Sequence, residues 1–201
     1  MASVDCSSAR WQSAGCAWQV EAMLTTLPLD LIAAMAAVTH DTCGAVATFV
    51  GTTRGLDAPT GRRVLRLEYE AHTSLALAQA LRLGRAVAEG AGQCGNSAND
   101  PPAAAPLGRI YVAHRIGSVG VGEASIVVAV ATPHRAHALS AVAWIMDRIK
   151  ESLPVWKREV LAEEDGEGGS AGGATAVWKE NSECPWRKPE GSANGATGVG
   201  V

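Results

Sequence analysis

The stretch SIVVAVATPHRAHALSAVAWIMDRIKESLPVWKREVL, residues 125–161, decides the fold because it carries a buried strand, a long helix and a chain reversal in succession. Residues 125–130 are apolar on both faces, which predicts a strand inside a sheet. Apolar residues then recur at spacings of three and four within residues 135–153, which predicts a helix. That helix would bury Leu139, Val142, Met146, Ile149 and Leu153. Pro154 ends it, and residues 155–161 are predicted as another strand.

The N-terminal side of this stretch mixes strand and helix signals. Residues 64–70 alternate large apolar and charged side chains, which is typical of a strand with one solvated face. We also predict strands at residues 44–51 and 110–112, helices at residues 29–35 and 74–89, and a glycine-bearing loop at residues 117–122. The elements follow no regular βαβ repeat, so the sequence predicts an α+β domain.

Charge and length bound the possible classes of protein. Lys and Arg number 17 against 20 Asp and Glu, a net charge of -3 over 201 residues. This argues against nucleic-acid binding through a strong positive field. The length suits one domain, which we expect at residues 18–186 with insertions at 91–106 and 163–175. A disordered lead at residues 1–17 and a flexible tail at residues 187–201 would flank it.

The cysteine spacing and the hydropathy of the sequence indicate which cellular compartment and which cofactors to expect. The five cysteines form no Cys-x-x-Cys pair, which fits neither a zinc site nor a disulfide framework. Charged residues or His interrupt every apolar run before the roughly 20 residues that a membrane span needs. We therefore expect free thiols, no metal, no cofactor, no nucleic-acid or membrane partner, and a place in the cytosol.

The first candidate site is the tetrapeptide Thr132-Pro133-His134-Arg135, between the buried strand and the long helix. A helix N-terminus carries unpaired N–H groups and a partial positive charge. An adjacent His and Arg would complete an anion pocket. The alternative is an ordinary helix start, with Thr132 as the cap and both side chains solvated.

The second candidate site is the pair Lys150 and Lys157. Lys150 falls at the edge of the apolar stripe of its helix, and the break at Pro154 lets the chain turn back toward it. Two lysines brought together suit proton transfer or nucleophilic chemistry, whereas the alternative is two ordinary surface lysines. Arg54, in a glycine-bounded loop after a strand, is a third candidate.

In their order along the chain, these segments resemble the large, catalytic subunit of molybdopterin synthase. The resemblance extends from about Val20 to Trp186, with two insertions. It is carried by CGAVATFVGTTR at 43–54, LEYEA at 67–71, HRIG at 114–117, EAS at 123–125, ATPHRA at 131–136, MDRIKESLPVWKRE at 146–159 and WKENSEC at 178–184.

The resemblance implies an α/β-hammerhead type of α+β fold, with a mixed or antiparallel sheet and packed helices. It also implies a homodimer that binds a small ubiquitin-like sulfur-carrier subunit at each outer end, forming a heterotetramer. The thiocarboxylated Gly-Gly terminus of the carrier would supply two sulfurs to cyclic pyranopterin monophosphate. The product would be molybdopterin, in molybdenum cofactor biosynthesis.

By the same resemblance, Lys150 and Lys157 would be the catalytic pair. His134 and Arg135 would hold the phosphate or pterin of the substrate, and Arg54 would add positive charge across the dimer interface. The rest of the pocket would comprise Phe49, Met146, Arg158 and Glu159. Cations suit this reaction because a cyclic phosphate and a thiocarboxylate are both anionic and repel each other. No metal is required, since the sulfur arrives on the partner.

Two other functions stay open. A non-catalytic scaffold could bind a ubiquitin-like sulfur carrier without any cationic cluster. The chain has all four cations of that cluster, which favours the enzyme: Arg54, Arg135, Lys150 and Lys157. A generic phosphate-binding enzyme would act without any protein partner.

Overall fold

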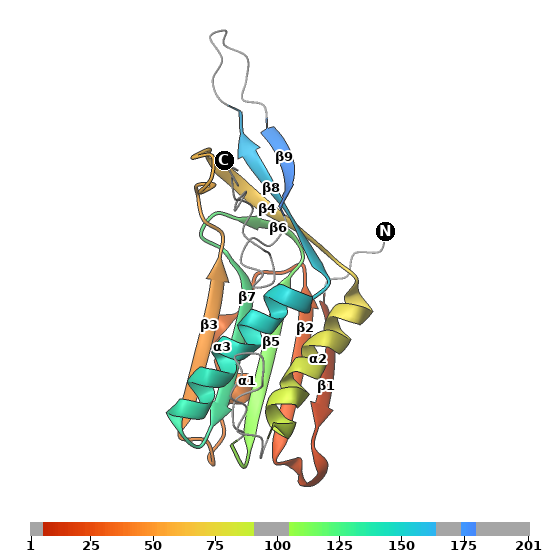
Figure 1. Cartoon of the computed structure of the whole chain (residues 1–201), viewed down its shortest axis with the longest axis vertical. Coiled ribbons are helices and arrows are strands. Elements are labelled where there is room, and N and C mark those ends of the chain that lie inside the picture. Colours follow the sequence, from red (N-terminus) through yellow and green to blue (C-terminus); the bar gives the residue numbers. More distant parts are fainter. Residues whose placement is uncertain (1–5, 91–104, 164–173, 180–201) are drawn as a thin grey trace, which may run out of the picture.

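The computed structural model describes residues 6–90, 105–163 and 174–179, which form two β-sheets, three α-helices and one short 3-10 helix (Figure 1). Most of both predicted insertions and all of the predicted tail lie outside the described residues. None of the described helices is both long enough and apolar enough to cross a membrane.

The larger sheet has five strands in the order β1-β2-β5-β7-β3. Their bounds are β1 Cys6–Gln12, β2 Trp18–Thr25, β3 Ala45–Thr52, β5 Gly108–Arg115 and β7 Ala124–Thr132. β2 and β5 pair in parallel and the other neighbours pair antiparallel, so the sheet is mixed. β7 is an interior strand, and every residue of it from Ser125 onward is buried. The predicted interior strand is therefore confirmed.

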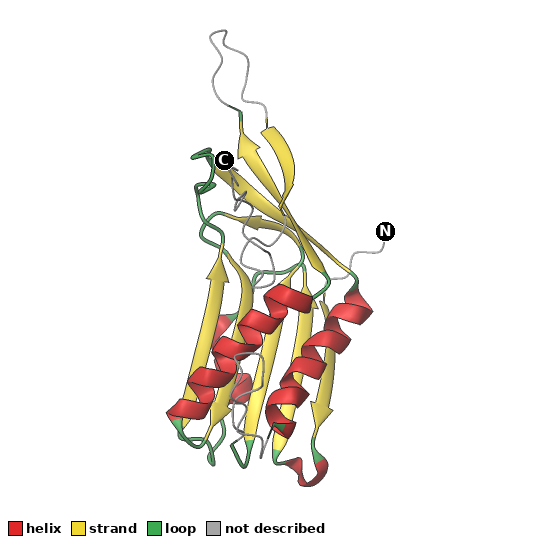
Figure 2. Ribbon diagram, viewed as in Figure 1, coloured by secondary structure: helices red, strands yellow, loops and turns green. Residues whose placement is uncertain are grey.

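Helices cover the two faces of this sheet unequally (Figure 2). α2 (Thr73–Glu89) and α3 (Arg135–Ser152) lie side by side on one face, and α1 (Leu31–Val38) packs on the other. The main core lies beneath α2 and α3 and includes Val20, Ile110, Val128, Val142 and Ile145. Burying an aliphatic side chain of this size stabilises a fold by roughly 2 kcal/mol, so this face anchors the domain.

The smaller sheet is antiparallel, with the order β6-β4-β8-β9. Its strands are β4 Val64–Ala71, β6 Gly117–Gly120, β8 Val155–Ala162 and β9 Ala174–Lys179. It lies beyond the end of the larger sheet at which both β3 and α3 finish (Figure 1). α3 runs into β8 through Leu153 and Pro154, so the two sheets meet at this junction.

The structure confirms the α+β prediction and corrects the predicted N-terminal lead. Residues 6–16 are ordered as β1 and a 3-10 helix, Ala14–Cys16. Residues 6–12 are mostly small or polar, so their own strand propensity is low, but they pair with β2 along their whole length. Trp11 packs against the main core, and the guanidinium of Arg85 lies 5.2 Å from the centroid of its ring. Tertiary pairing thus supplies the order that the local sequence does not signal.

Candidate functional site

Lys150 and Lys157 lie on either side of the junction between α3 and β8. Lys150 is half-buried in the last turn of α3, where its charge complements the partial negative charge of a helix C-terminus. Leu153 ends the helix, and Val155 N donates to Leu153 O at 2.7 Å, which folds the chain tightly around Pro154. β8 continues away from the larger sheet instead of running back along α3 (Figure 1), so the predicted chain reversal is wrong, and the two lysines flank the junction of the two elements.

β8 places Lys157 beside Glu159 and Tyr69. Residues two apart on a strand point to the same face, and Lys157 Nζ lies 3.4 Å from a carboxylate oxygen of Glu159. Tyr69 is the neighbour of Lys157 across the β4–β8 pairing. The Lys157 side chain is 34% exposed and that of Glu159 only 12%, so the ion pair is partly withdrawn from solvent. The ammonium group of Lys157 therefore has a defined position on this face of the smaller sheet.

Arg54 is exposed in the loop that follows β3, and the turn between β6 and β7 holds this loop. Thr53 N donates to Glu123 O at 3.1 Å. The Glu123 carboxylate accepts from Gly120 N at 2.7 Å and from Arg115 Nη1 at 2.8 Å. These partners, chiefly the Gly120 N–H, lower the pKa of Glu123 below its ordinary value. The backbone that carries Arg54 is thus fixed at the same end of the larger sheet as the two lysines.

His134 and Arg135 lie at the opposite end of α3 from Lys150 (Figure 1). Both are exposed, and His134 is the N-cap in place of Thr132, whose hydroxyl donates to His134 O at 2.9 Å. A helix of 18 residues is about 27 Å long at a rise of roughly 1.5 Å per residue. No side chain spans that length. The structure therefore corrects the expectation that His134 and Arg135 join the two lysines within one chain.

The other predicted pocket residues differ in their surroundings. Met146 is 7% exposed and belongs to the main core beneath α3, whereas Phe49 is 37% exposed on the edge strand β3. Arg158 points to the opposite face of β8 from its two neighbours in sequence, because successive strand residues alternate. Its guanidinium pairs with Glu68. Arg158 therefore does not share the face on which Lys157 and Glu159 meet.

Two rings near this junction, the partly buried Tyr69 and the buried His114, were not singled out from the sequence. The rings of Tyr69 and His114 meet edge-on with their centroids 4.9 Å apart. His114 is 8% exposed, and its Nδ1 donates to Arg115 O at 2.7 Å. Burial lowers the pKa of His114 to about 4, although that hydrogen bond opposes the shift. The strand alternation placed Tyr69 on the apolar face of β4, which signals burial but not the identity of its partners.

We expect the free energy of unfolding to fall as the pH decreases from 7 toward 4. The pKa of His114 is about 4 when folded and 6.5 ordinarily, so between these values the unfolded chain binds a proton that the folded chain excludes. The contribution is complete above about pH 6.5 and is lost toward pH 4, amounting to roughly 3 kcal/mol at most. Urea unfolding at several pH values measures it.

Two variants isolate the contribution of His114. His114→Asn retains a donor toward Arg115 O but does not titrate, so the pH dependence should flatten. His40→Asn replaces an exposed histidine and is the control. Equal slopes in the two variants would contradict this assignment.

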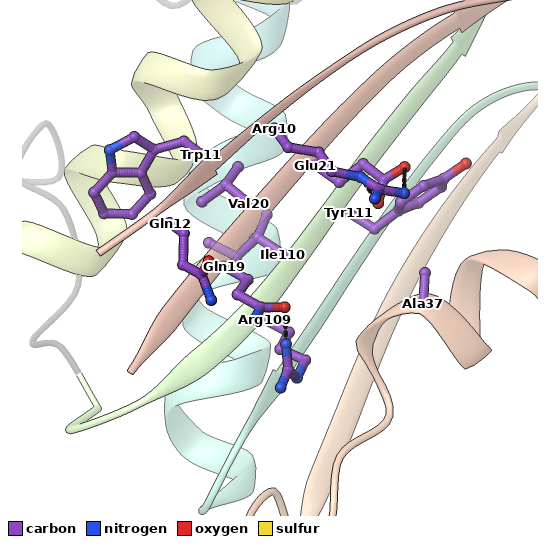
Figure 3. Close-up of a pocket in the computed structure, with 10 residues that line it drawn as sticks. All are labelled: Arg10, Trp11, Gln12, Gln19, Val20, Glu21, Ala37, Arg109, Ile110 and Tyr111. Atoms are coloured by element: carbon purple, nitrogen blue, oxygen red, sulfur yellow. Dashed lines mark hydrogen bonds and ion pairs between the residues drawn. The ribbon is translucent and has the colours of Figure 1, made fainter. Parts of the chain in front are cut away.

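An open hollow of about 600 Å³ lies on the α1 face of the larger sheet (Figure 3). α1 packs on β7, β5 and β3, so side chains of β1 and β2 remain uncovered on this face. Arg10 pairs with Glu21 at 3.0 Å, and Arg109 donates to Gln19. The predicted site residues are not among those that line the hollow. These two pairings are typical of a solvated sheet face.

Comparisons with known proteins place this geometry in context. Residues 24–152 match the profile of a family described as MoaE protein. The chain is 42% identical over 151 residues to the molybdopterin synthase catalytic subunit of Culex quinquefasciatus, covering 75% of this chain and 82% of that one. The corresponding protein of Taeniopygia guttata is 37% identical over 148 residues, covering 74% and 79%. The crystal structure of molybdopterin synthase from Staphylococcus aureus superposes with a TM-score of 0.57 at 25% identity, over 78% of this chain and 94% of that chain.

Proposed function

The chain belongs to the MoaE protein family of molybdopterin synthase catalytic subunits, and from this premise we propose which of its residues bind the reactants and which act in sulfur transfer. It is the catalytic subunit of a sulfurtransferase in molybdenum cofactor biosynthesis. The sulfur donor is the thiocarboxylated C-terminus of a small ubiquitin-like carrier subunit, and cyclic pyranopterin monophosphate accepts two sulfurs. The observation that supports this site most strongly is that Lys150, in the last turn of α3, and Lys157, near the start of β8, flank the junction of these two elements.

The reaction requires positive charge at the junction of α3 and β8, because both reactants are anions. The cyclic phosphate and the thiocarboxylate repel each other, and their approach becomes favourable only when cations offset both charges. Lys150, Lys157 and Arg54 lie at the same end of the molecule. Arg158 contributes less because Glu68 already pairs with it.

The two lysines also provide protons. Negative charge develops on the substrate as sulfur adds, and an ammonium group can donate a proton to a leaving oxygen or stabilise the charge directly. The contact with Glu159 holds the ammonium of Lys157 in place, so Glu159 acts by positioning it. Lys150 reaches the same junction from the end of α3.

A homodimer would bring His134 and Arg135 to this junction from a second subunit. The start of β3 lies beside these residues, because Ala45 pairs with Thr132, whereas the end of β3 leads to Arg54. Two β3 edges placed antiparallel around a two-fold axis would set the start of one strand against the end of the other. His134 of the partner subunit would then lie near Arg54 and bind the substrate phosphate. In this arrangement Arg54 acts with the lysines of its own chain, and His134 and Arg135 cross the interface in place of Arg54, which the resemblance would place there.

Exposed apolar side chains on the β3 side support this arrangement. β3 is an edge strand of the larger sheet, and Val46 and Phe49 on it are 42% and 37% exposed. Leu139, which the helical spacing predicts to be buried, is 61% exposed on the neighbouring α3. An unpaired strand edge flanked by apolar groups is suited to burial in an obligate interface. The resulting dimer, with one carrier at each outer end, would be a heterotetramer of the cytosol.

Reconstitution with purified components tests the proposal. The chain should convert cyclic pyranopterin monophosphate into molybdopterin when the carrier ends in a thiocarboxylate, and it should form no product when the carrier ends in an ordinary carboxylate. Carrier binding without product would favour the non-catalytic scaffold. Turnover of the phosphate compound without any carrier would favour a generic phosphate-binding enzyme.

A further inference from the structure

The strand pairing that orders β3 ends at Thr52, just before Arg54. The register of β3 against β7 shifts between Gly51 and Thr52, which is a β-bulge. A bulge bends its strand and interrupts regular pairing, and bulges are common beside active sites. The β3–β7 pairing therefore does not set the direction in which Arg54 leaves the sheet, and the loop depends on other contacts.

The turn between β6 and β7, residues 120–123, supplies such contacts. Thr53 N donates to Glu123 O at 3.1 Å, and Gly122 N donates to Thr53 O at 2.9 Å. Both backbone polar groups of Thr53 are thus bonded to the turn. Thr53 O belongs to the planar peptide unit that continues into Arg54, so the second bond fixes the orientation of that peptide.

The backbone on the other side of Arg54 is also held. Gly55 O accepts from Val64 N, at the first residue of β4, at 2.9 Å. Thr53 is 3% exposed and Val64 is 4% exposed, so both anchors of the loop are buried. Arg54 itself is exposed between them. Its backbone is therefore fixed while its side chain is free to meet a ligand from solvent.

The Glu123 side chain stabilises the shape of the turn. Its carboxylate accepts from Gly120 N at 2.7 Å, and Glu123 N donates to Gly120 O at 3.1 Å, so these two residues close the turn. Gly122 has a φ of +81°, a left-handed conformation that glycine adopts readily. The carboxylate thus maintains the conformation in which Glu123 O and Gly122 N bond to Thr53.

Arg115 connects this turn to the larger sheet. It is the last residue of β5, its side chain is only 11% exposed, and its Nη1 donates to the Glu123 carboxylate at 2.8 Å. Hydrogen bonds between two charged groups are roughly twice as strong as neutral ones. Ile116 N, one residue further, donates to Thr25 O at the end of β2 at 2.8 Å. The contacts therefore lead from a fixed strand end, through Glu123, to the loop of Arg54.

We propose that the ion pair of Arg115 and Glu123 is a positioning pair that preorganises Arg54 for the anionic substrate. This inference rests on the proposed function, in which Arg54 offsets the charge of the reactants. A loop that becomes ordered only on binding loses conformational entropy, which weakens affinity, whereas a loop already held avoids that loss. Neither member of the pair has to touch the substrate, because both act through the backbone of residues 53–55.

Glu123→Ala should raise the dissociation constant of cyclic pyranopterin monophosphate about three- to tenfold, as measured by isothermal titration calorimetry. Removing a negative charge beside an anion site would by itself tighten binding, so the direction of the change separates positioning from simple electrostatics. Glu123→Gln keeps an oxygen that accepts from Gly120 N and should bind more tightly than Glu123→Ala. An unchanged or lower dissociation constant in Glu123→Ala would overturn the inference.

Glu89→Ala is the matched control. Glu89 is an exposed carboxylate that pairs with Arg85 at 2.8 Å on α2, so its removal causes the same change in net charge and also breaks an ion pair. The dissociation constant should stay within about twofold of wild type. An increase as large as that of Glu123→Ala would mean that the position of the carboxylate is irrelevant, which would contradict the proposal.

The effect of Glu123 must pass through Arg54. Arg54→Ala should weaken binding at least as much as Glu123→Ala, and the double variant should bind within about twofold of Arg54→Ala, because the positioned side chain is already absent. In steady-state turnover, KM should rise in Glu123→Ala while kcat stays within about twofold of wild type. Multiplicative effects of the two substitutions would show that they act separately and would overturn the inference.

Amide hydrogen exchange tests the positioning without substrate or turnover. The Thr53 and Gly122 amides are bonded between loop and turn, so they should exchange at least about tenfold faster in Glu123→Ala. The Val128 amide, inside β7, should keep its wild-type rate. Unchanged exchange at Thr53, or equal acceleration at Val128, would overturn the inference. A wild-type chain that forms no molybdopterin would count against the proposed function, and exchange would then decide the positioning role alone.

Discussion

Lys150→Ala should reduce molybdopterin formation by roughly 100- to 10,000-fold, the range that a general acid or base contributes in enzymes. The side chain lies in the last turn of α3, next to the tight turn at Pro154 that leads to the strand carrying Lys157. Its loss removes one proton donor and one of the charges that offset the anionic reactants. Single-turnover formation of molybdopterin from thiocarboxylated carrier measures the effect.

Companion variants separate the two roles of this lysine. Lys150→Arg keeps the positive charge but is a poor proton donor, so a rate restored to near wild type would mean that charge alone matters. Arg82→Ala removes an exposed cation from the neighbouring α2 and should change the rate less than about twofold. Lys150→Ala should still form dimers and bind the carrier. A near-normal rate in Lys150→Ala would remove this residue from the mechanism.

Activity should return when two inactive variants assemble together. One variant carries Lys150→Ala, and the other carries both His134→Ala and Arg135→Ala. Because α3 separates these groups by its whole length, the working site should take its lysines from one subunit and His134 and Arg135 from the other. Random assembly makes half of the dimers hybrid, each with one intact site, so about a quarter of the wild-type activity should appear.

The recovery distinguishes a shared site from a site within one chain. If each chain completed its own site, a hybrid dimer would contain two defective sites and the mixture would stay inactive. Co-expression with two affinity tags isolates the hybrid, whose activity should be about half that of the wild type. An inactive hybrid with intact carrier binding would contradict the two-subunit arrangement.

The central elements of the fold were predictable because their signals are local. The repeat of apolar residues along α3 indicated the helix and part of its buried face, although Leu139 is exposed, and the run at residues 125–130 marked β7 as interior. β1 and β6 were not predicted, because non-local strand pairing orders them. Residues 6–12 are ordered by pairing with β2, and Gly117–Gly120 by pairing with β4. Neither pairing leaves a periodic pattern in its own segment.

The candidate site was predictable in its residue types but not in its geometry. The break at Pro154 was predictable, and it separates Lys150 at the end of α3 from Lys157 near the start of β8. Helix length alone separates His134 and Arg135 from that junction, which a linear motif does not reveal. The strand alternation of β8 gives Arg158 a different face from Lys157. The edge-on contact of Tyr69 with His114 joins positions far apart in sequence, so no local spacing could indicate it.

Counting sulfur in a single turnover tests the central claim most directly. Purified wild-type chain, thiocarboxylated carrier and cyclic pyranopterin monophosphate are mixed, and mass spectrometry follows the carrier terminus while the product is quantified. We predict that two carrier thiocarboxylates become carboxylates for each molybdopterin formed, and that neither change occurs with Lys150→Ala. Carrier that stays thiocarboxylated in a folded complex with the wild-type chain, with no product formed, would contradict the account.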